Sequence, residues 1–394
     1  MSAAEASRVI ESVVDKFGDE LIDLRRDLHA HPELSWQESR TTELVATRLA
    51  DLGFVVRRLP RSGLIADLGT QGPVVALRAD LDALPVDDRT GDPWASSAPG
   101  VAHACGHDVH TTCLLGAGMA LAELQVRGLL PGRVRLLFQP AEEVMPGGAL
   151  SMIENGALDD VVRAFGLHCD PGLDVGQVGL RVGPLTGAAD ALEVRLRGGG
   201  GHTSRPHLTQ DLTFALGTLV AQLPAALSRR LDPRAGLSLV WGLIQAGSAP
   251  NVIPATGRAA GTVRMLDART WAESEALVRR LTAQIVAPYG VEVDVDYTRG
   301  VPPVVNELAA TALLGRSVES VLGVAGHVST QQSLGGEDFG WYLHHVSGAM
   351  GRLGTRTPGG PTYDLHQGNL RIDERAIAIG ARVLAEAAVL GLDR

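Results

Sequence analysis

Apolar residues recur at two different spacings along the chain, and these spacings predict its secondary structure. In residues 5–30 and again in residues 39–52 the apolar positions follow the helical period. Short apolar runs at residues 54–59 and 64–68 are typical of strands, and the unbroken run at residues 74–77 is typical of a strand buried on both faces. The first part of the chain is therefore predicted to form surface helices followed by a sheet.

The next segments alternate strand, helix and strand. Residues 134–138 and 161–167 have the composition of strands, and residues 111–125, rich in Ala, Leu and Gly, are suited to a crossover helix. An Ala-rich helix is expected again at residues 373–392. This alternation predicts an α/β fold, a mostly parallel sheet with helices on both faces.

From about Thr186 the pattern changes, because residues 190–197 alternate apolar and polar positions, as expected of a sheet with one face in water. Further strands are expected at residues 237–244, 257–265 and 291–297, and helices at residues 212–227 and 271–287. A chain of 394 residues also exceeds the usual size of a single core. We predict one α/β domain formed by residues 1–185 and 299–394, and a smaller α+β domain inserted at residues 186–298.

Composition narrows the class of protein. Apolar residues make up 45% of the chain and charged residues 20%, which argues against disorder. The net charge of −10 argues against a nucleic acid or an anionic membrane as the main partner. The chain has three cysteines, an odd number and a small one for its length, so a disulfide framework is not expected. Unpaired cysteines favour a cytoplasmic location. Residues 1–17 lack the pattern of a signal peptide, and no apolar run reaches the length of about 18 residues that a membrane span needs.

Polar side chains follow three of the predicted strands. Asp80 and Asp82 come after residues 74–77, Glu142 and Glu143 after residues 134–138, and His168 after residues 161–167. In α/β sheets functional groups gather beyond the carboxyl ends of the strands. Two structural alternatives exist, turn aspartates for the first pair and carboxylates at a helix N-terminus for the second.

The stretch His103–Thr112 contains a thiol, three imidazoles and a carboxylate within eight positions. Such a stretch suits a metal site better than a polar loop with a buried cysteine, because Cys and His are the ligands that borderline-soft divalent metals select. Cys105, His107, Glu143, His168 and His366 would supply five ligands, enough for one metal with open positions or for two metals that share a bridge. Read alone, His366 is equally well explained as a surface histidine, and His29 and His31 are better explained as structural residues.

A cation lowers the pKa of water by several units, to about 7 in favourable zinc cases. Glu142 stands next to a candidate ligand but is constrained by the backbone to point elsewhere. It can therefore act as the general base that takes a proton from this water.

These residues are ordered along the chain as in a known family. The sequence resembles, over nearly its whole length, the aminoacylase and carboxypeptidase type of co-catalytic metallopeptidases, and within it the amidohydrolase subgroup of indole-acetyl-amino-acid hydrolases, hippurate hydrolases and N-acetyl-diaminopimelate deacetylases. The motifs that carry the resemblance are His31–Glu33, Arg78–Pro85, His103–Thr111, Phe138–Glu143, Gly166–His168, Gly201–His202, Pro250–Pro254, Gly336–Phe339 and Leu365–His366.

The resemblance implies roles for residues in both predicted domains. Cys105, His107, Glu143, His168 and His366 would be the metal ligands, Glu142 the general base, and Asp82 the carboxylate that orients a ligand. The insert would be a lid and dimerisation domain, in which His202 reaches the partner subunit's site to stabilise the oxyanion and Asn251 and Arg264 hold the substrate carboxylate.

The sequence departs from the family pattern at three places. Asp80 stands where relatives with a two-zinc site carry a histidine ligand, so this ligand is replaced. The run Gly198–Gly201 is longer than the family pattern, and Gly336 replaces a more usual serine.

The resulting hypothesis is a metal-dependent amidohydrolase that cleaves an N-acyl amino acid to a carboxylic acid and a free amino acid. It would use one or two divalent ions (Zn, Mn, Co or Ni) per subunit and act as a homodimer or higher homo-oligomer. The alternatives are a dipeptidase or carboxypeptidase with the same chemistry, and a non-catalytic protein that binds an acidic metabolite on the same fold.

Overall fold

The computed structural model describes residues 3–393 and divides the chain into two compact units. Unit 1 comprises Met1–Gly183, Val305–Gln331 and Asp338–Arg394, and unit 2 comprises Pro184–Val304 and Gln332–Glu337. The short strands β7 (Gly183–Pro184) and β14 (Val305–Asn306) lie where the chain passes from one unit to the other. Within residues 3–393, no helix has the length and apolar character that crossing a bilayer requires.

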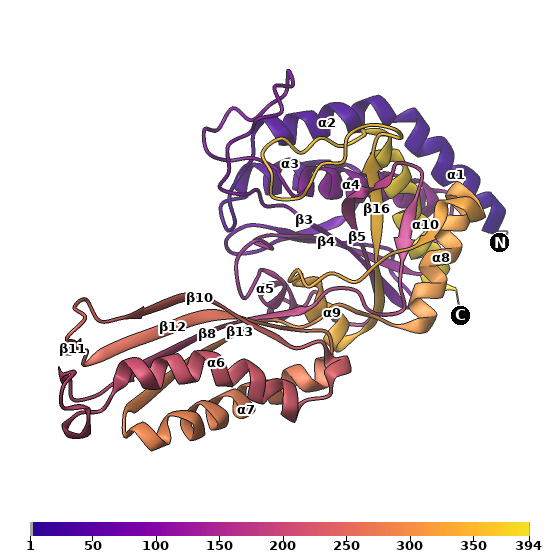
Figure 1. Ribbon diagram of the computed structural model, residues 1–394. Helices are drawn as coiled ribbons and strands as arrows, with labels where there is room; N and C mark the ends of the chain where they lie inside the picture. Colours follow the sequence, from indigo (N-terminus) through magenta and orange to yellow (C-terminus); the bar gives the residue numbers. More distant parts are fainter. Residues whose placement is uncertain (1–2, 394) are drawn as a thin grey trace. The chain divides into compact units, whose positions relative to one another are not determined.

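Unit 1 is built on an eight-stranded sheet in the order β1-β2-β4-β3-β5-β16-β6-β15. Strands β3, β4, β5 and β16 of this sheet are labelled in Figure 1. The four adjacent strands β4, β3, β5 and β16 run parallel, whereas β1, β2 and β4 pair in antiparallel fashion. The predicted mostly parallel sheet is thus confirmed. The strand bounds are Val55–Arg58 (β1), Leu64–Leu68 (β2), Val74–Asp80 (β3), Arg133–Gln139 (β4), Val161–Asp174 (β5), Val178–Leu180 (β6), His327–Ser329 (β15) and Ser347–Arg356 (β16).

Helices cover both faces of this sheet. α4 and α10 contact each other together with β3 and β5, and α5 and α9 contact each other on the opposite face. The alternation of side chains in β5 produces this arrangement, because Phe165 lies against Gly391 of α10 while the next residue, Gly166, lies against Phe339 of α9. The helix bounds are Ala3–Lys16 (α1), Gly18–Ala30 (α2), Ser39–Asp51 (α3), His107–Val126 (α4), Ala149–Glu154 (α5), Leu308–Leu322 (α8), Phe339–His345 (α9) and Arg375–Leu392 (α10).

Unit 2 contains a four-stranded antiparallel sheet in the order β10-β12-β8-β13, with helices α6 and α7 packed on it (Figure 1). The residues of β8 alternate between buried and less buried positions, which is the pattern predicted for a sheet with one face in water. A separate pair, β9 with β11, carries His202. The bounds are Ala188–Arg197 (β8), Gly201–His202 (β9), Leu212–Arg230 (α6), Ser238–Ala246 (β10), Val252–Ile253 (β11), Thr256–Met265 (β12), Ala268–Val286 (α7) and Glu292–Val301 (β13).

Unit 2 also includes residues 332–337, which the sequence prediction placed in the other domain. Several hydrogen bonds attach this segment. Among them, the backbone N–H of Ser333 donates to the carbonyl of Leu185, Gln332 Nε2 donates to the carbonyl of Pro184, and Arg264 Nη1 donates to the carbonyl of Leu334 over 2.6 Å. Bonds of this kind join residues far apart in the sequence, so no local pattern could have indicated them.

A buried carboxylate organises the interior of unit 2. Asp190 on β8 is 1% exposed and accepts hydrogen bonds from Trp271 Nε1 on α7, from the Tyr297 hydroxyl on β13 and from the backbone N–H of Gly300. Burial and the bond to Asp190 raise the pKa of the Tyr297 hydroxyl, which therefore remains a donor. The Asp190 carboxylate on β8 is thus the common acceptor for donors from α7 and β13.

Replacing Asp190 with Ala should destabilise unit 2, because three buried donors would lose their acceptor and each such loss costs about 1–3 kcal/mol. We expect a fall of several degrees in the melting temperature, measured by thermal denaturation followed by circular dichroism. The matched change Asp294→Ala, at an exposed position of β13, should alter stability by less than about 0.5 kcal/mol. Equal effects of the two changes would contradict the role given to Asp190.

Candidate functional site

The carboxyl ends of three parallel strands bring the predicted site residues of unit 1 together. β3 ends at Asp80, which pairs with Gln139 at the end of β4, and Arg78 of β3 lies opposite Gly166 of β5. His168 follows Gly166 by two residues and so projects at the level of Asp80. Neighbouring parallel strands end at the same edge of a sheet, which places these groups side by side.

Two predicted boundaries at this edge were wrong. β5 does not end at Leu167 but continues to Asp174, because β16 pairs with it and sets Arg352 opposite His168. α4 begins at His107 instead of Thr111, so its first turn carries site residues. Gly106 precedes it with φ 86°, and a side chain there would approach Cys169 Sγ to 2.8 Å, so this entry to the helix requires glycine.

The five predicted metal ligands form two overlapping groups. The donor atoms of Cys105, His107 and His168 all lie within 4.8 Å of one another, and so do those of Cys105, Glu143 and His366. Cys105 Sγ is 3.6 Å from His168 Nε2, and Glu143 Oε1 is 3.4 Å from His366 Nε2. Cys105 belongs to both groups, so the five residues form one continuous set of donors that could hold one or two cations.

Hydrogen bonds determine which ring nitrogens of the two buried histidines can bind a cation. His107 Nδ1 donates to the carbonyl of Asp82 and His168 Nδ1 donates to the carbonyl of Cys169, each over 2.8 Å. In the neutral form of each ring the proton therefore lies on Nδ1, and Nε2 has a lone pair for a cation. Among the described residues, His107 Nε2 and Glu143 Oε1 are buried and make no hydrogen bond. Buried polar atoms of this kind need a partner, and a divalent cation would provide one.

Burial also sets the charge of these groups in the absence of a cation. It raises the pKa of the Cys105 thiol and of the Glu143 carboxyl, and it lowers the pKa of His168 well below its ordinary value. A bound cation favours the thiolate, the carboxylate and the neutral imidazole, so it opposes the effect of burial at Cys105 and Glu143 and acts in the same direction as burial at His168. The donor set therefore fits a divalent metal chemically.

Asp82 holds the backbone that carries the two adjacent glutamates. Its Oδ1 accepts the N–H of Glu142 over 3.0 Å and its Oδ2 accepts the N–H of Glu143 over 2.9 Å. The Ser35 hydroxyl donates to the same carboxylate over 2.7 Å. Asp82 is 1% exposed, so its carboxylate is fixed by these bonds and by the nearby His107 ring, 3.4 Å away.

Glu142 and Glu143 lie in a turn between β4 and α5, so the alternative that they begin a helix is wrong. One carboxylate oxygen of Glu142 lies within 4.8 Å of the donor atoms of His107 and Glu143. Two residues here have a left-handed backbone, Ala141 with φ 54° and His366 with φ 61°. Residues other than glycine adopt this conformation at a cost, and such residues cluster at functional sites.

His366 reaches the site through a backbone contact. Its N–H donates to the carbonyl of Ala104 over 2.7 Å, which places it beside Cys105. Its side chain is 54% exposed, whereas the side chain of Glu143 is 9% exposed. His366 is therefore part of the donor group and at the same time its most open member.

A buried network next to these donors was not predicted from the sequence. Arg78 donates to Asp80 and to Asp338, each over 2.7 Å, and His110 Nδ1 donates to the second oxygen of Asp80 over 2.6 Å. His110 Nε2 accepts the N–H of Cys169, so this imidazole is neutral. Both oxygens of Asp80 thus have donors from the protein. Arg78 and Asp338 stand in the family motifs, and this was the only signal for them.

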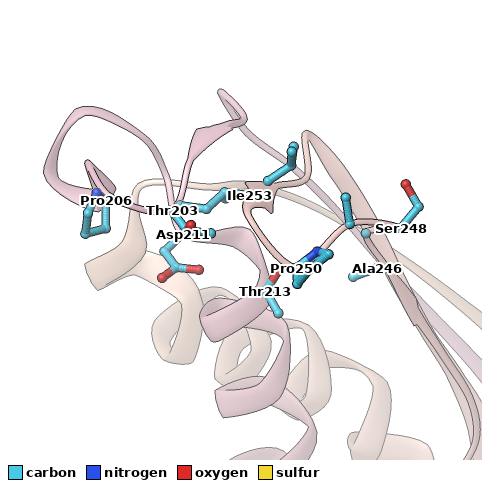
Figure 2. Close-up of a pocket in the computed structure, with 11 residues that line it drawn as sticks. Thr203, Pro206, Asp211, Thr213, Ala246, Ser248, Pro250 and Ile253 are labelled. Atoms are coloured by element: carbon cyan, nitrogen blue, oxygen red, sulfur yellow. The ribbon is translucent and has the colours of Figure 1, made fainter.

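The remaining predicted residues belong to unit 2. Exposed His202 on β9 pairs with Val252 of β11, and the carbonyl of Asn251 accepts the N–H of Thr203. A polar cavity of about 530 Å³ lies beside this strand pair, and Thr203, Asp211 and Pro250 are among the residues that line it (Figure 2). Arg264 lies at the far end of β12, where it binds the carbonyl of Leu334.

Comparisons with known proteins identify the family of this chain. Residues 76–389 match the model of peptidase family M20/M25/M40. The chain is 38% identical over 393 residues to an N-acetyl-L-cysteine deacetylase of Bacillus subtilis, covering 99% of this chain and 91% of that protein. It is also similar to the crystal structure of the Bacillus subtilis protein YxeP, described as a dinuclear metal-binding peptidase, with a TM-score of 0.83, 34% identity, and coverage of 96% of this chain and 99% of that one.

One relative is much longer. The chain is 49% identical over 366 residues, 92% of its own length, to a Rhodococcus jostii protein that carries the name of a glutamate–cysteine ligase, and it spans 46% of that protein. The ligase name therefore describes a protein of about twice this length and assigns no activity to the chain.

The family resemblance inferred from the motifs is thus confirmed, and with it a divalent metal cofactor. The alternative of a non-catalytic binding protein is set aside, because the matched relatives hydrolyse amide bonds by name. The chain belongs to the peptidase family M20/M25/M40 and is a metal-dependent hydrolase that acts on amide bonds.

Proposed function

We propose that this protein hydrolyses an N-acyl amino acid to a carboxylic acid and a free amino acid. The observation that supports this most is the pair of donor groups sharing Cys105, with the Glu142 carboxylate next to them. The similarity to an N-acetyl-L-cysteine deacetylase makes small N-acetyl amino acids, N-acetylcysteine among them, the first substrates to test.

In this proposal Cys105, His107, Glu143, His168 and His366 hold one or two divalent cations, Zn, Mn, Co or Ni. When bound, a cation of this kind supplies Lewis acidity, which lowers the pKa of water and polarises a carbonyl oxygen. The lone pairs on His107 Nε2 and His168 Nε2 and the shared Cys105 sulfur support the assignment.

Glu142 is the proposed general base. It takes a proton from the attacking water as the new C–O bond forms, and it hands this proton to the amide nitrogen as the C–N bond breaks. The amine then leaves as a neutral group and no proton is lost or gained overall. Asp82 serves this step by fixing the backbone N–H groups of Glu142 and Glu143.

Residues of unit 2 complete the proposal. His202 donates a hydrogen bond to the oxyanion in the partner subunit's site, while Asn251 and Arg264 bind the substrate carboxylate, a task that suits the planar guanidinium. A homodimer is the simplest assembly that this role of His202 allows. Strand β10 supports a homodimer, because β10 is an edge strand of its sheet and carries the exposed apolar residues Val240 and Ile244.

The three cysteines are buried and unpaired, which favours the cytoplasm as the location of the protein.

A peptidase activity is the second candidate, because the similar protein YxeP is described as a peptidase. The two candidates differ in the substrate's amino group, which is acylated in one and free in the other. An assay of N-acetylated dipeptides beside the same dipeptides with free amino groups distinguishes them.

Replacing Glu142 with Gln should lower kcat on the preferred N-acyl amino acid by about 10²- to 10⁴-fold, the usual contribution of a general base. Metal content should stay at the wild-type level, since Glu142 is not a proposed ligand. The measurements are steady-state kinetics and metal analysis. Glu154→Gln, an exposed glutamate on α5, is the matched control and should remain fully active. A Glu142→Gln enzyme with wild-type kcat would contradict the proposed role.

Adding Zn²⁺ or Mn²⁺ to the metal-free protein should release protons at neutral pH, because burial keeps the Cys105 thiol protonated until a cation binds. The cation competes with these protons, so metal affinity should fall as the pH is lowered. Calorimetry in two buffers of different ionisation enthalpy measures both effects. Cys105→Ala should release about one proton fewer, whereas Cys113→Ala should release the wild-type number. Unchanged proton release in Cys105→Ala would exclude Cys105 as a ligand.

Mixing two inactive variants tests the proposed role of His202 in the partner subunit. His202→Ala removes the proposed oxyanion donor, and Glu142→Gln removes the proposed general base. In a mixed dimer, one site therefore combines an intact Glu142 from one subunit with an intact His202 from the other. Random exchange of subunits should restore about a quarter of wild-type activity, since half of the dimers are mixed and each has one working site. His207→Ala, a nearby exposed histidine, should be active without mixing. Failure of the mixture to regain activity would show that His202 does not act across subunits.

A further inference from the structure

Two buried carboxylates bind three consecutive backbone N–H groups in the turn that carries the proposed general base. Asp82 accepts the N–H groups of Glu142 and Glu143, and Glu38 Oε1 accepts the N–H of Ala141 over 2.7 Å. Each carboxylate also accepts a serine hydroxyl, and the hydroxyl of Ser62 donates to Glu38 Oε2 over 2.5 Å. The bond to Ala141 lies immediately before the proposed base.

Ala141 has a left-handed backbone, with φ 54°. This conformation is disfavoured for alanine but not for glycine, so the surrounding structure must enforce it. The direction of the chain after residue 141, and with it the starting point of the Glu142 side chain, depends on this conformation. The hydrogen bond from Ala141 to Glu38 is one contact that can maintain it.

Glu38 is available for this bond because another residue caps the helix that follows it. Glu38 is the residue before α3, yet its side chain makes no cap. Instead the carboxylate of Glu33 accepts the N–H groups of Arg40 and Thr41, at 2.9 and 2.8 Å. The carboxyl of Glu38 is therefore free to turn inward, where it is completely buried. Because Glu33 caps α3, the carboxylate of Glu38 can bind the N–H of Ala141 at the site instead.

Burial raises the pKa of Glu38, although its hydrogen bonds act in the other direction. The acceptor role does not depend on this charge, because Oε1 can accept the Ala141 N–H in either protonation state. A glutamine has the same shape and can also accept with Oε1 while donating to the Ser62 oxygen. The amide therefore serves as a conservative replacement, and an apolar side chain of similar size does not.

We infer that Glu38 is a positioning residue for Glu142, holding Ala141 in its left-handed conformation and so directing the general base toward the metal donors. This inference rests on the proposed function. The Glu38 side chain forms hydrogen bonds with the backbone N–H of Ala141 and with the hydroxyl of Ser62. It contacts none of the five proposed ligands in this way, whereas Asp82 also lies against His107. The effect of Glu38 on the base can thus be separated from metal binding.

The test compares Glu38→Met, which removes the acceptor but keeps the volume, with Glu38→Gln, which keeps both. In the Met variant kcat should fall by about 100-fold, the effect of a small misplacement of a reacting group. KM and metal content should stay within about threefold of wild type, and the Gln variant should keep its kcat within the same range. Glu43→Ala, an exposed change on α3, the helix that follows Glu38, is the control and should be fully active.

A second change provides a rescue. Glycine at position 141 adopts the left-handed conformation without help, so Glu38→Met with Ala141→Gly should recover at least about tenfold in kcat over Glu38→Met alone. Should Glu38→Met not fold, Ser62→Ala, which removes only the hydroxyl bond to Glu38, should still lower kcat in the same direction by a smaller factor. Rescue by glycine is not expected if Glu38 merely supports the fold.

Hydrogen exchange measured by mass spectrometry gives a readout without substrate. In the metal-free protein, Glu38→Met should accelerate exchange in residues 139–148 and leave α4 unchanged, and Glu38→Gln should do neither. If the wild type hydrolyses no N-acyl amino acid while this exchange pattern is found, the proposed function fails and the positioning by Glu38 stands. Wild-type exchange in Glu38→Met, or equal losses of kcat in the Met and Gln variants, would overturn the inference.

Discussion

The guanidinium of Arg78 is the group on which the arrangement of the site depends. It is 2% exposed and donates to Asp80 on its own strand, to Asp338 before α9 and, through Nε, to Gln139 at the end of β4. Asp338 in turn accepts the N–H of Ala149 at the start of α5. The Arg78 guanidinium thus balances the negative charge of two buried carboxylates. Through them and Gln139 it joins both ends of the turn that carries Glu142 and Glu143. Removing one partner of such a network commonly costs about 3–5 kcal/mol, because the remaining charges stay buried without compensation.

The same network shows what Asp80 does at the position where relatives with a two-zinc site carry a histidine ligand. Asp80 stands at that position, but its two oxygens accept hydrogen bonds from Arg78 and His110. His107 Nε2 lies 3.6 Å from it, within range of its charge but beyond a hydrogen bond. Asp80 therefore places its negative charge next to His107, and the five donors grouped around Cys105 remain the proposed ligands.

The part of this structure that the sequence could predict is the part encoded locally. The apolar run at residues 74–77 indicated β3, and the short spacing of Cys105 and His107 indicated a metal site. The start of α4 was missed because its first turn holds site residues instead of an apolar face, and the end of β5 was missed because its pairing partner, β16, lies far along the chain. Glu38 was missed for the same reason, since its partner is 103 positions away and no spacing rule connects them.

The insertion of unit 2 has a consequence for the order in which this protein can fold during synthesis. β5 has two neighbours in the sheet, β3 before the insertion and β16 after it. Until residues 347–356 leave the ribosome, the β16 side of β5 is an open strand edge in the middle of the future sheet, a surface prone to wrong pairing. His366 emerges later still. A chain interrupted after residue 304 would therefore hold four of the five proposed donors and lack His366. If His366 is a ligand, as proposed, metal loading is expected to be a late event of biogenesis.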